Sequence, residues 1–199
     1  MKVIGLCGGS GSGKGAVCAA FDRLGIPAID CDAVYHDLTS YLSPCLVELS
    51  QEFGDGIIKD GRLDRTALRD VVFDPAFVSV RQPRLNEITH KYVIAEVERL
   101  LAEYAADGKI GAIIDAPLLF EAGIDRRCDC VIAVIADRDI RLQRIMTRDG
   151  IDHVRASRRI DSQLPDAALA SRADIVITNN GSLSDLDCEV TRAYHEIFG

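Results

Sequence analysis

The sequence has no apolar run long enough to cross a bilayer, and its N-terminus lacks the layout of a signal peptide. The longest apolar run, VIAVIA at 131–136, falls far short of the roughly 20 residues that a membrane-spanning helix needs. MKVIGL leads directly into a strand-like segment. An excess of positive charge is also missing: the formal net charge is −8, which disfavours general binding to nucleic acids or membrane surfaces. We therefore expect a cytoplasmic protein that binds neither.

Metal and disulfide motifs are equally scarce. The seven cysteines include no pair with the C-x-x-C spacing of zinc sites, and the four histidines are scattered and form no ligand pattern. An odd number of cysteines without a secretion signal favours reduced thiols, most of them small buried apolar side chains. The sequence therefore predicts neither a structural zinc site nor a disulfide framework.

Repeats, low-complexity tracts and long linkers are missing too, so the 199 residues, 48% of them hydrophobic, are expected to form one α/β unit with a substantial core. Short apolar runs predict buried parallel strands at 2–7, 112–116, 130–136 and 174–179, with a weaker one at 26–30. Helices are expected between them, starting near residues 14, 64, 83, 137, 152, 165 and 182, and Gly108 is expected to cap the longest. The region from about 40 to 105 shows no convincing strand and is interpreted as a helical insertion beside the sheet.

The stretch GLCGGSGSGKGAV at 5–17 predicts a phosphate-binding loop. Four glycines lie in the eight residues 7–14, which end in Gly-Lys between a buried strand and an amphipathic helix, the context that the pattern G-x-x-x-x-G-K-[ST] requires. The glycines let backbone N–H groups turn toward phosphate oxygens, the helix N-terminus adds positive potential, and Lys14 would reach the β- and γ-phosphates. The alternative is a glycine-rich turn that binds nothing, which the specificity of the pattern disfavours.

One position departs from this pattern. Gly15 stands where Ser or Thr normally offers a hydroxyl to Mg²⁺. The backbone cradle needs no side chain, and Mg²⁺ commonly keeps several waters and is held through substrate phosphates. A water could fill the vacant position, so we predict weakened Mg²⁺ binding with activity retained.

Acidic side chains at strand ends are candidates for the chemistry. Asp30 and Asp32 lie at the end of the second predicted strand, where parallel sheets place their sites. Asp32 is the better candidate to accept or orient the proton of an attacking hydroxyl, and Asp30 would hold metal-bound water or cap the next helix. Capping of a helix at 31–38 by both is an equally weighted alternative. Asp115 resembles a strand-end acid that supports Mg²⁺ through water, with a simple strand-end turn as its alternative.

The segment from 138 to 163 contains seven arginines and four aspartates, so it is basic in a chain that is acidic as a whole. Arg141, Arg144 and Arg148 share one helix face through their i, i+3, i+7 spacing. Such a face could close over ATP and neutralise charge on a transferred phosphoryl group. The alternative is a solvated face with local Asp–Arg pairs. Because the phosphate-binding loop is present, we favour a mobile lid.

The order of these pieces resembles the dephospho-CoA kinase family over nearly the whole chain. IGLCGGSGSGKGAVCAAFDRLGIPAIDCDAV is similar to the opening of that family, with its loop, helix and D-x-D pair. GRLDRTALRDVVFDP, LNEITHKYV and DAPLLFEAG follow, and then RLQRIMTRDG, RRIDSQLP and ADIVITNNGSL. PLLFE is the most specific piece, and the others gain specificity from their order.

The resemblance implies a three-layer P-loop kinase fold that transfers the γ-phosphoryl group of ATP, with Mg²⁺, to the 3′-hydroxyl of dephospho-CoA. It further implies one unit with a core at about 1–39, 108–137 and 164–199. A helical CoA-binding region at about 40–107 and a lid at about 138–163 would complete the unit.

The same resemblance assigns site residues. Asp32 matches the catalytic base and a substrate contact, Lys14 the loop lysine, and Arg144 and Arg148 two lid arginines, of which Arg144 is counted as catalytic and Arg148 as an ATP contact. The ATP loop corresponds to Gly11, Ser12, Gly13, Lys14, Gly15 and Ala16. Arg65 and His90 fall in the CoA-binding region, and Asn180 near the adenine end of ATP. The sequence departs from the family pattern at two places. Gly15–Ala16 replaces the usual Ser-Thr, which is expected to affect Mg²⁺ binding and turnover. Lys91 replaces a proline after His90, which is expected to change only the helix there.

Two other functions remain open at the level of the sequence. Another P-loop kinase, acting on a nucleoside or nucleotide, would share the loop but leave PLLFE and the LN…H segment unexplained. A module that binds a nucleotide or CoA without phosphoryl transfer is favoured by Gly15. Lys14, Asp32 and the lid arginines argue against that module, because it has no need of all of them.

Overall fold

Five strands form the central sheet, in the order β2-β5-β1-β6-β7, in a computed structural model that describes residues 1–199. The strands are β1 (Lys2–Cys7), β2 (Ala28–Asp30), β5 (Gly111–Asp115), β6 (Cys130–Ile135) and β7 (Ile175–Thr178). β1 pairs in parallel with β5 and β6, and β6 pairs in parallel with β7. All five predicted strands are confirmed within two residues at each end, because each is a short apolar run that the sheet buries.

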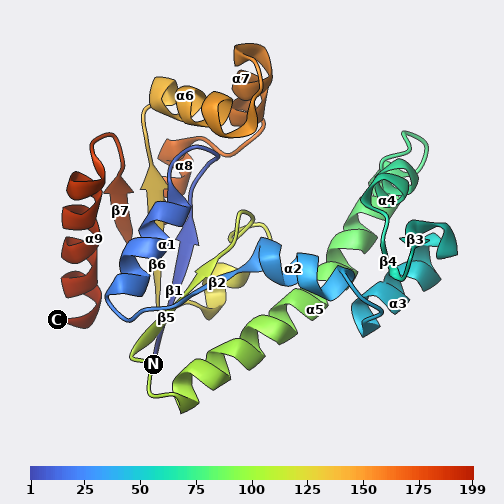
Figure 1. Cartoon of the computed structure of the whole chain (residues 1–199), viewed down its shortest axis with the longest axis horizontal. Helices are drawn as coiled ribbons and strands as arrows, with labels where there is room; N and C mark the ends of the chain where they lie inside the picture. Colours follow the sequence, from blue (N-terminus) through green and yellow to red (C-terminus); the bar gives the residue numbers. More distant parts are fainter. The chain divides into compact units, whose positions relative to one another are not determined.

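The chain divides into two compact units, Met1–Ile29 with Tyr104–Gly199, and Asp30–Glu103. In the first unit, α1 (Lys14–Arg23) and α9 (Leu183–Phe198) pack side by side along the sheet (Figure 1), while α8 (Asp166–Ala170) contacts β6. The main core lies between the sheet and α1 and α9, and includes Phe21, Ile113 and Val190. A capping box between Ser182 and Asp185 starts α9, so the expected helix start there is confirmed.

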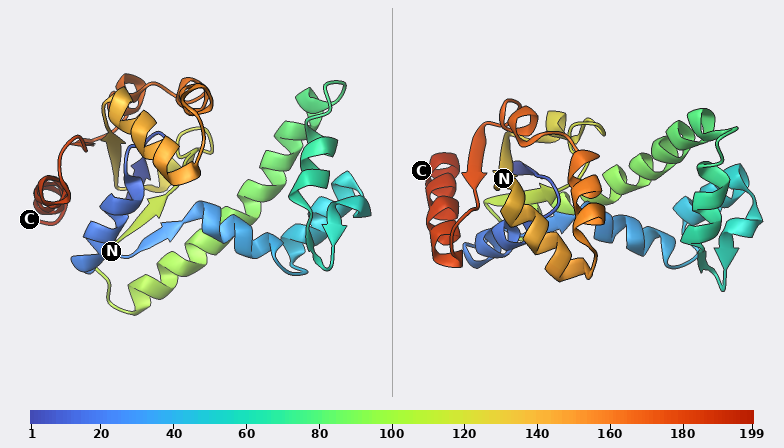
Figure 2. Two further views of the ribbon diagram at one scale, coloured as in Figure 1. Left: turned by 45° about the horizontal axis from the view of Figure 1, so that its top comes forward. Right: turned by 90° about the horizontal axis from the view of Figure 1, so that it is seen from above.

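Helices α6 (Arg138–Asp149) and α7 (His153–Asp161) lie beyond the C-terminal ends of β1 and β6, as Figures 1 and 2 show. They pack on each other through an apolar cluster of their own, formed by Leu142, Ile145, Ala156 and Ile160. Gly150 (φ 64°) ends α6 in the left-handed conformation, and the Asp152 carboxylate caps α7 by accepting from the Arg155 N–H. This helical pair is therefore a small folded element with its own core.

The second unit contains α2 (Cys31–Thr39), α3 (Pro44–Phe53), α4 (Arg65–Val72) and most of α5 (Val78–Ala106). Figure 2 shows α3 and α4 gathered around the N-terminal part of α5. Leu49, Leu68 and Ile88 meet in their shared core. Asp64 caps α4 as expected. The remaining short helices, η1 (Asp55–Ile57) and η2 (Ile124–Arg127), are single 3₁₀ turns.

The expectation that 40–105 contains no strand is wrong. A two-stranded antiparallel hairpin pairs β3 (Ile58–Lys59) with β4 (Arg62–Leu63). Its turn residues, Asp60 (φ 52°) and Gly61 (φ 72°), both take positive φ, as the tight turns of two-residue hairpins require. Asp-Gly is a strong hairpin signal, but each strand has only two residues, too few for an alternating pattern to show.

The expected start of a helix near Pro83 is also wrong, because α5 begins at Val78 and Pro83 lies inside it. The Asp74 side chain accepts from the Ala76 N–H and its carbonyl accepts from the Val78 N–H, with Pro75 next to it. Asp-Pro thus marks the turn at 74–77 that leads into the helix, with Asp74 accepting the first N–H groups.

The other end of α5 is as predicted. Gly108 (φ 74°) ends it, its N–H donating to the Ala105 carbonyl and the Lys109 N–H donating to the Tyr104 carbonyl. This helix has 29 residues, yet neither it nor any other helix is long and apolar enough to cross a membrane.

Candidate active site

The predicted phosphate-binding loop connects β1 to α1 at the carboxyl edge of the sheet. Two of its glycines, Gly9 and Gly13, are required by packing. A Cβ added at Gly9 would lie 2.2 Å from Nη2 of Arg141, and one added at Gly13 would lie 2.1 Å from Nδ2 of Asn179. Gly13 also has φ 100°, which disfavours any side chain. Polar side chains from other segments therefore pack directly against the backbone of the loop.

Ser10 is held by two side chains from the arginine-rich segment. Its N–H donates to Oε1 of Gln163 (2.8 Å), its hydroxyl accepts from Nε2 of the same amide (3.1 Å), and its carbonyl accepts from Nε of Arg141 (2.9 Å). Arg141 is 4% exposed and also donates to Asp166 (2.7 Å). The expectation that Arg141 faces ATP together with Arg144 and Arg148 is therefore wrong, because its guanidinium is used to hold the loop.

The middle of the loop is held through its carbonyl groups. The Ser12 carbonyl accepts from Nδ2 of Asn179 (2.8 Å) and from Nη1 of Arg144 (3.4 Å), which also donates to the Gly11 carbonyl (3.3 Å). Nη2 of Arg144 donates to Oδ1 of Asn179 (3.4 Å). These donors engage oxygens that would otherwise repel a phosphate. Arg144, predicted as catalytic, thus lies at the loop, and Ser12 is completely buried.

The end of the loop is more open. Nζ of Lys14 lies 3.7 Å from Oδ1 of Asp115, and the Cys18 thiol lies 3.8 Å from the other carboxylate oxygen. Two residues predicted independently, from the loop and from the end of the third predicted strand, are therefore brought together. Gly15 is exposed, and a Cβ added there would meet no atom within 4 Å. Packing does not explain why serine is missing at this position.

The two aspartates of the D-x-D pair have different surroundings. The Asp30 carboxylate caps α2 by accepting from the N–H groups of Asp32 (2.9 Å) and Ala33 (3.1 Å). This confirms the capping alternative for Asp30. Asp32 lies in the first turn of the same helix and its side chain is exposed. Asp32, the predicted base, is therefore not the residue that caps α2.

The remaining predicted residues lie on four separate elements. Arg148, on α6, is exposed and pairs with Asp149 (2.7 Å). A hydrogen bond from Arg148, assisted by Arg159, lowers the pKa of Asp149 to about 2. Local Asp–Arg pairs, the alternative interpretation of this segment, are thus also present.

Asn180 links two loops, because its side-chain oxygen accepts from the Asp137 N–H (2.8 Å). Arg65 is exposed at the first position of α4. His90 is half-buried in α5, and burial lowers its pKa, so its imidazole is neutral near pH 7.

Gln163, Asn179 and Asp166 are site residues that the sequence analysis missed. Asn179 follows β7 directly and is 6% exposed. A polar residue at the carboxyl end of a parallel strand is a general signal for a site, and it was available here. Gln163 and Asp166 carry no such signal, since their importance comes from contacts with the distant Ser10 and with Arg141.

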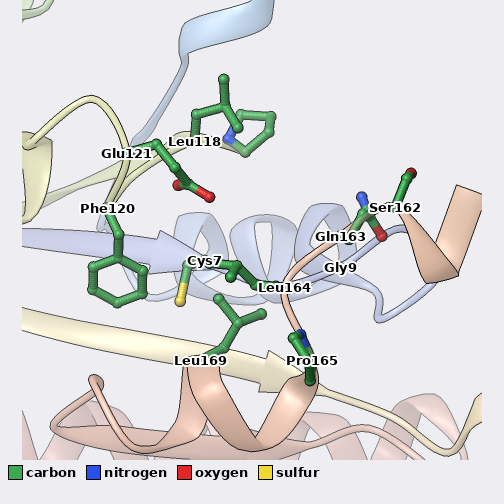
Figure 3. Close-up of a pocket in the computed structure, with 12 residues that line it drawn as sticks. Cys7, Gly9, Leu118, Phe120, Glu121, Ser162, Gln163, Leu164, Pro165 and Leu169 are labelled. Atoms are coloured by element: carbon green, nitrogen blue, oxygen red, sulfur yellow. The ribbon is translucent and has the colours of Figure 1, made fainter.

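A pocket adjoins the start of the loop (Figure 3). It has a volume of about 360 Å³ and is lined by residues 7–9, by four of residues 117–121, by residues 162–165 and by Leu169. We call it the PLLFE pocket, because the PLLFE string provides one wall. Burial raises the pKa of the Cys7 thiol in its floor to about 11. The guanidinium of Arg172 lies 3.9 Å from the centre of the Phe120 ring, which belongs to the PLLFE wall.

A glycine-rich loop that ends in lysine, placed between the central strand β1 and α1, together with this strand order, defines the class of P-loop kinases. The family model for dephospho-CoA kinase matches residues 2–185. The chain belongs to the dephospho-CoA kinase family, whose members are ATP-dependent phosphotransferases.

Individual relatives agree with this assignment. The dephospho-CoA kinase of Corynebacterium glutamicum is 40% identical over 199 residues, covering 99% of this chain and 98% of the relative. The crystal structure of TT1252 from Thermus thermophilus is 32% identical with a TM-score of 0.79, and 100% and 98% of the two chains are covered. The structure of dephospho-CoA kinase from Campylobacter jejuni is similar in fold, with 24% identity, a TM-score of 0.71 and coverage of 98% and 96%. The family resemblance and the fold class predicted from the sequence are confirmed.

Proposed function

We propose that this dephospho-CoA kinase transfers the γ-phosphoryl group of ATP to the 3′-hydroxyl of dephospho-CoA, giving CoA and ADP, with the residues assigned below. The observation that carries the proposal is a phosphate loop held in place by the protein's own side chains. Its carbonyl groups at Gly11 and Ser12 accept from Arg144 and Asn179, and Lys14 stands beside Asp115. Such preorganisation is what phosphoryl transfer requires, because positioning and charge stabilisation provide most of its catalysis.

The positive groups at the loop have separate tasks. The N–H groups of residues 11–16 bind the ATP phosphates, and Lys14 exchanges its ion pair with Asp115 for the β- and γ-phosphates. Arg144 stabilises charge on the transferred group, since its guanidinium already lies at the loop. Arg148 is exposed on the same helix and contacts ATP on the outer side of the site.

Asp32 accepts the proton of the attacking 3′-hydroxyl. Its neighbour Asp30 is committed to the helix cap, whereas the Asp32 carboxylate is exposed. A carboxylate in this role orients the hydroxyl and takes its proton as the new P–O bond forms. Arg65 and His90 contact the substrate in the helical unit, and Asn180 lies toward the adenine of ATP.

Mg²⁺ fits this site as an ion brought by the nucleotide. Groups of three or more His, Cys, Asp or Glu side chains able to hold a metal do not occur in the protein. Asp115 is the strand-end acid beside Lys14, and it would bind the ion through water. When bound, Mg²⁺ would neutralise phosphate charge, and Gly15 provides no hydroxyl for it.

The helical pair α6–α7 acts as a lid. Water must be excluded from the phosphoryl group, and the pair has its own apolar cluster, so α7 and the end of α6 can close together while Arg141 and Arg144 stay on the loop. We expect slower hydrogen exchange in residues 138–163 when a non-hydrolysable ATP analogue and dephospho-CoA bind together. Equal protection with and without the ligands would exclude lid closure.

The experiment that tests the function is mass-spectrometric detection of CoA from ATP and dephospho-CoA in a Mg²⁺ titration. Wild-type protein should form CoA and ADP in equal amounts, and Asp32→Asn should lose at least about a hundredfold in kcat. ADP release with a nucleoside or nucleotide, but none with dephospho-CoA, would instead identify another P-loop kinase. Nucleotide binding without ADP release for any acceptor would identify a binding module.

A further inference from the structure

The PLLFE pocket has a wall that is apolar in its larger part and open to solvent, although it touches the loop. Leu118 is 51% exposed and Leu164 is 38% exposed, and Figure 3 shows Leu118 beside Glu121 and Leu164 on the separate segment that leads to Pro165. Its volume of about 360 Å³ falls within the range of about 300–1,000 Å³ that is usual for small-molecule sites. Apolar side chains held open beside a phosphate-binding loop indicate a ligand that covers them.

The charges in the wall restrict what this ligand can be. Lysine and arginine are absent from the residues that line the pocket, and Glu121 is its charged side chain. A diphosphate or other anion would be repelled by that carboxylate, and the nearby guanidinium of Arg172 is stacked on the Phe120 ring and is not itself part of the lining. A neutral, flat ring with an N–H donor suits the pocket better, since Leu118 and Leu164 can cover its faces and Glu121 can accept the hydrogen bond.

The position of the pocket indicates which part of the acceptor, dephospho-CoA, would bind in it. Gly8 and Gly9, the start of the phosphate loop, form part of the wall. The 3′-hydroxyl must reach the γ-phosphate at this loop, and the ribose that carries this hydroxyl also carries the adenine. The pantetheine arm is separated from the same ribose by the diphosphate, so it extends away from the reacting hydroxyl. The neutral group nearest to the reaction is therefore the adenine.

We propose that the PLLFE pocket is the subsite for the adenine ring of dephospho-CoA, with Leu118 and Leu164 against the ring and Glu121 accepting from its exocyclic amine. This inference rests on the proposed function and adds to it the group by which the acceptor is recognised. The competing occupant is the adenine of ATP, which the test below distinguishes.

The first experiment compares Leu118→Ala with Ile110→Ala. Both leucine and isoleucine are about half exposed, at 51% and 52%, and Ile110 precedes β5 whereas Leu118 follows it, so the control lies at the other edge of the sheet. The dissociation constants for dephospho-CoA and for ATP are measured by calorimetry with the full chain. Leu118→Ala should raise the dissociation constant for dephospho-CoA about tenfold, because it removes apolar contact from the ring. The dissociation constant for ATP should stay within about twofold of the wild-type value. Ile110→Ala should change neither.

The second experiment tests Glu121 with a changed base. Hypoxanthine replaces the exocyclic amine of adenine by a carbonyl, which repels a carboxylate, and its donor on that edge is the N1–H, which is displaced from the position of the amine. Wild type should bind dephospho-CoA about tenfold more tightly than its hypoxanthine analogue, and Glu121→Gln should bring the two within about twofold, since an amide can donate or accept. An unchanged preference in Glu121→Gln would contradict the role of this residue.

The outcomes separate this inference from the proposed function. Loss of ATP binding in Leu118→Ala would overturn the inference and assign the pocket to the nucleotide. Unchanged binding of both ligands in Leu118→Ala and in Leu164→Ala, with melting temperatures like wild type, would overturn it as well. Because binding is measured at equilibrium, the same results decide the question even if the wild-type protein forms no CoA, which would by itself refute only the function.

Discussion

The two halves of the phosphate loop differ in how they are held. In the first half, Ser10 and Ser12 bind side chains from distant segments, and an added Cβ at Gly9 would collide with one of them. In the second half, Gly15 is exposed and has open space around it. The rigid half fixes the phosphate cradle through contacts that a mutation can break, whereas the open half tolerates change. Four substitutions test this comparison, from the largest expected effect to the smallest.

Arg141→Leu should have the largest effect. It removes the guanidinium that binds the Ser10 carbonyl and Asp166, and it leaves a partly buried carboxylate without its cation. We expect a loss of about 3 kcal/mol in the free energy of unfolding, measured with urea, and weaker ATP binding. Arg148→Leu is the matched control on the same helix, because its side chain is largely exposed and its stability should change by less than about 0.5 kcal/mol. Similar losses of unfolding free energy in Arg141→Leu and Arg148→Leu would contradict the view that Arg141 holds the loop and Arg148 does not.

Gly13→Ala should come next. Its methyl group would lie 2.1 Å from Nδ2 of Asn179, at a φ of 100°. We expect a loss of roughly 2 kcal/mol in stability together with loss of ATP binding, from strained backbone and displacement of the amide. Gly15→Ala provides the contrast: with no atom within 4 Å, it should gain up to about 0.5–1 kcal/mol, because alanine suits a helix better than glycine. Thermal unfolding of both variants would show whether the signs are opposite.

Asn179→Ala should have a smaller effect. It leaves the buried Ser12 carbonyl without the amide donor at 2.8 Å, which costs about 1–2 kcal/mol. Asn180→Ala is the matched control, since Asn180 is the next residue but exposed. If urea unfolding showed equal losses of free energy for Asn179→Ala and Asn180→Ala, the hydrogen bond from Asn179 to the Ser12 carbonyl would not explain the loss.

Gly15→Ser should have the smallest effect on maximal activity. The space around Gly15 admits the side chain, and the new hydroxyl could bind Mg²⁺. We expect a few-fold lower Mg²⁺ concentration for half-maximal CoA formation, with a nearly unchanged rate at saturating Mg²⁺. Equal rates for the two proteins at limiting Mg²⁺ would mean that the hydroxyl is not needed here.

The sequence predicts the elements whose signals are local. The five strands follow from apolar runs, and the loop follows from the spacing of its glycines and Lys14. It does not separate Arg141 from Arg144, which share a helix face, because the burial of Arg141 depends on Ser10, 131 residues away in the chain. Arginines at helical spacing look alike until the fold brings their partners together.

Two local structures that differ from the prediction had signals in the sequence. Asp60–Gly61 indicates a hairpin and Asp74–Pro75 indicates the turn that leads into a helix, but both lie in a region interpreted as uniformly helical from its long periodic segment. In the candidate site, Lys14, Asp115 and Arg144 were predicted from patterns. Gln163 and Asp166 were not, because contact with one distant loop leaves no periodicity.

The buried cysteines have a consequence for a protein whose substrate and product both end in a thiol. Thiol–disulfide exchange needs the thiolate, and burial raises the pKa of Cys7, Cys45 and Cys130 to about 11 and of Cys128 to about 12. At neutral pH the Cys7 side chain is therefore held as the thiol. The wall of the PLLFE pocket therefore carries a sulfur that resists forming a mixed disulfide with oxidised CoA, even where the acceptor binds beside it.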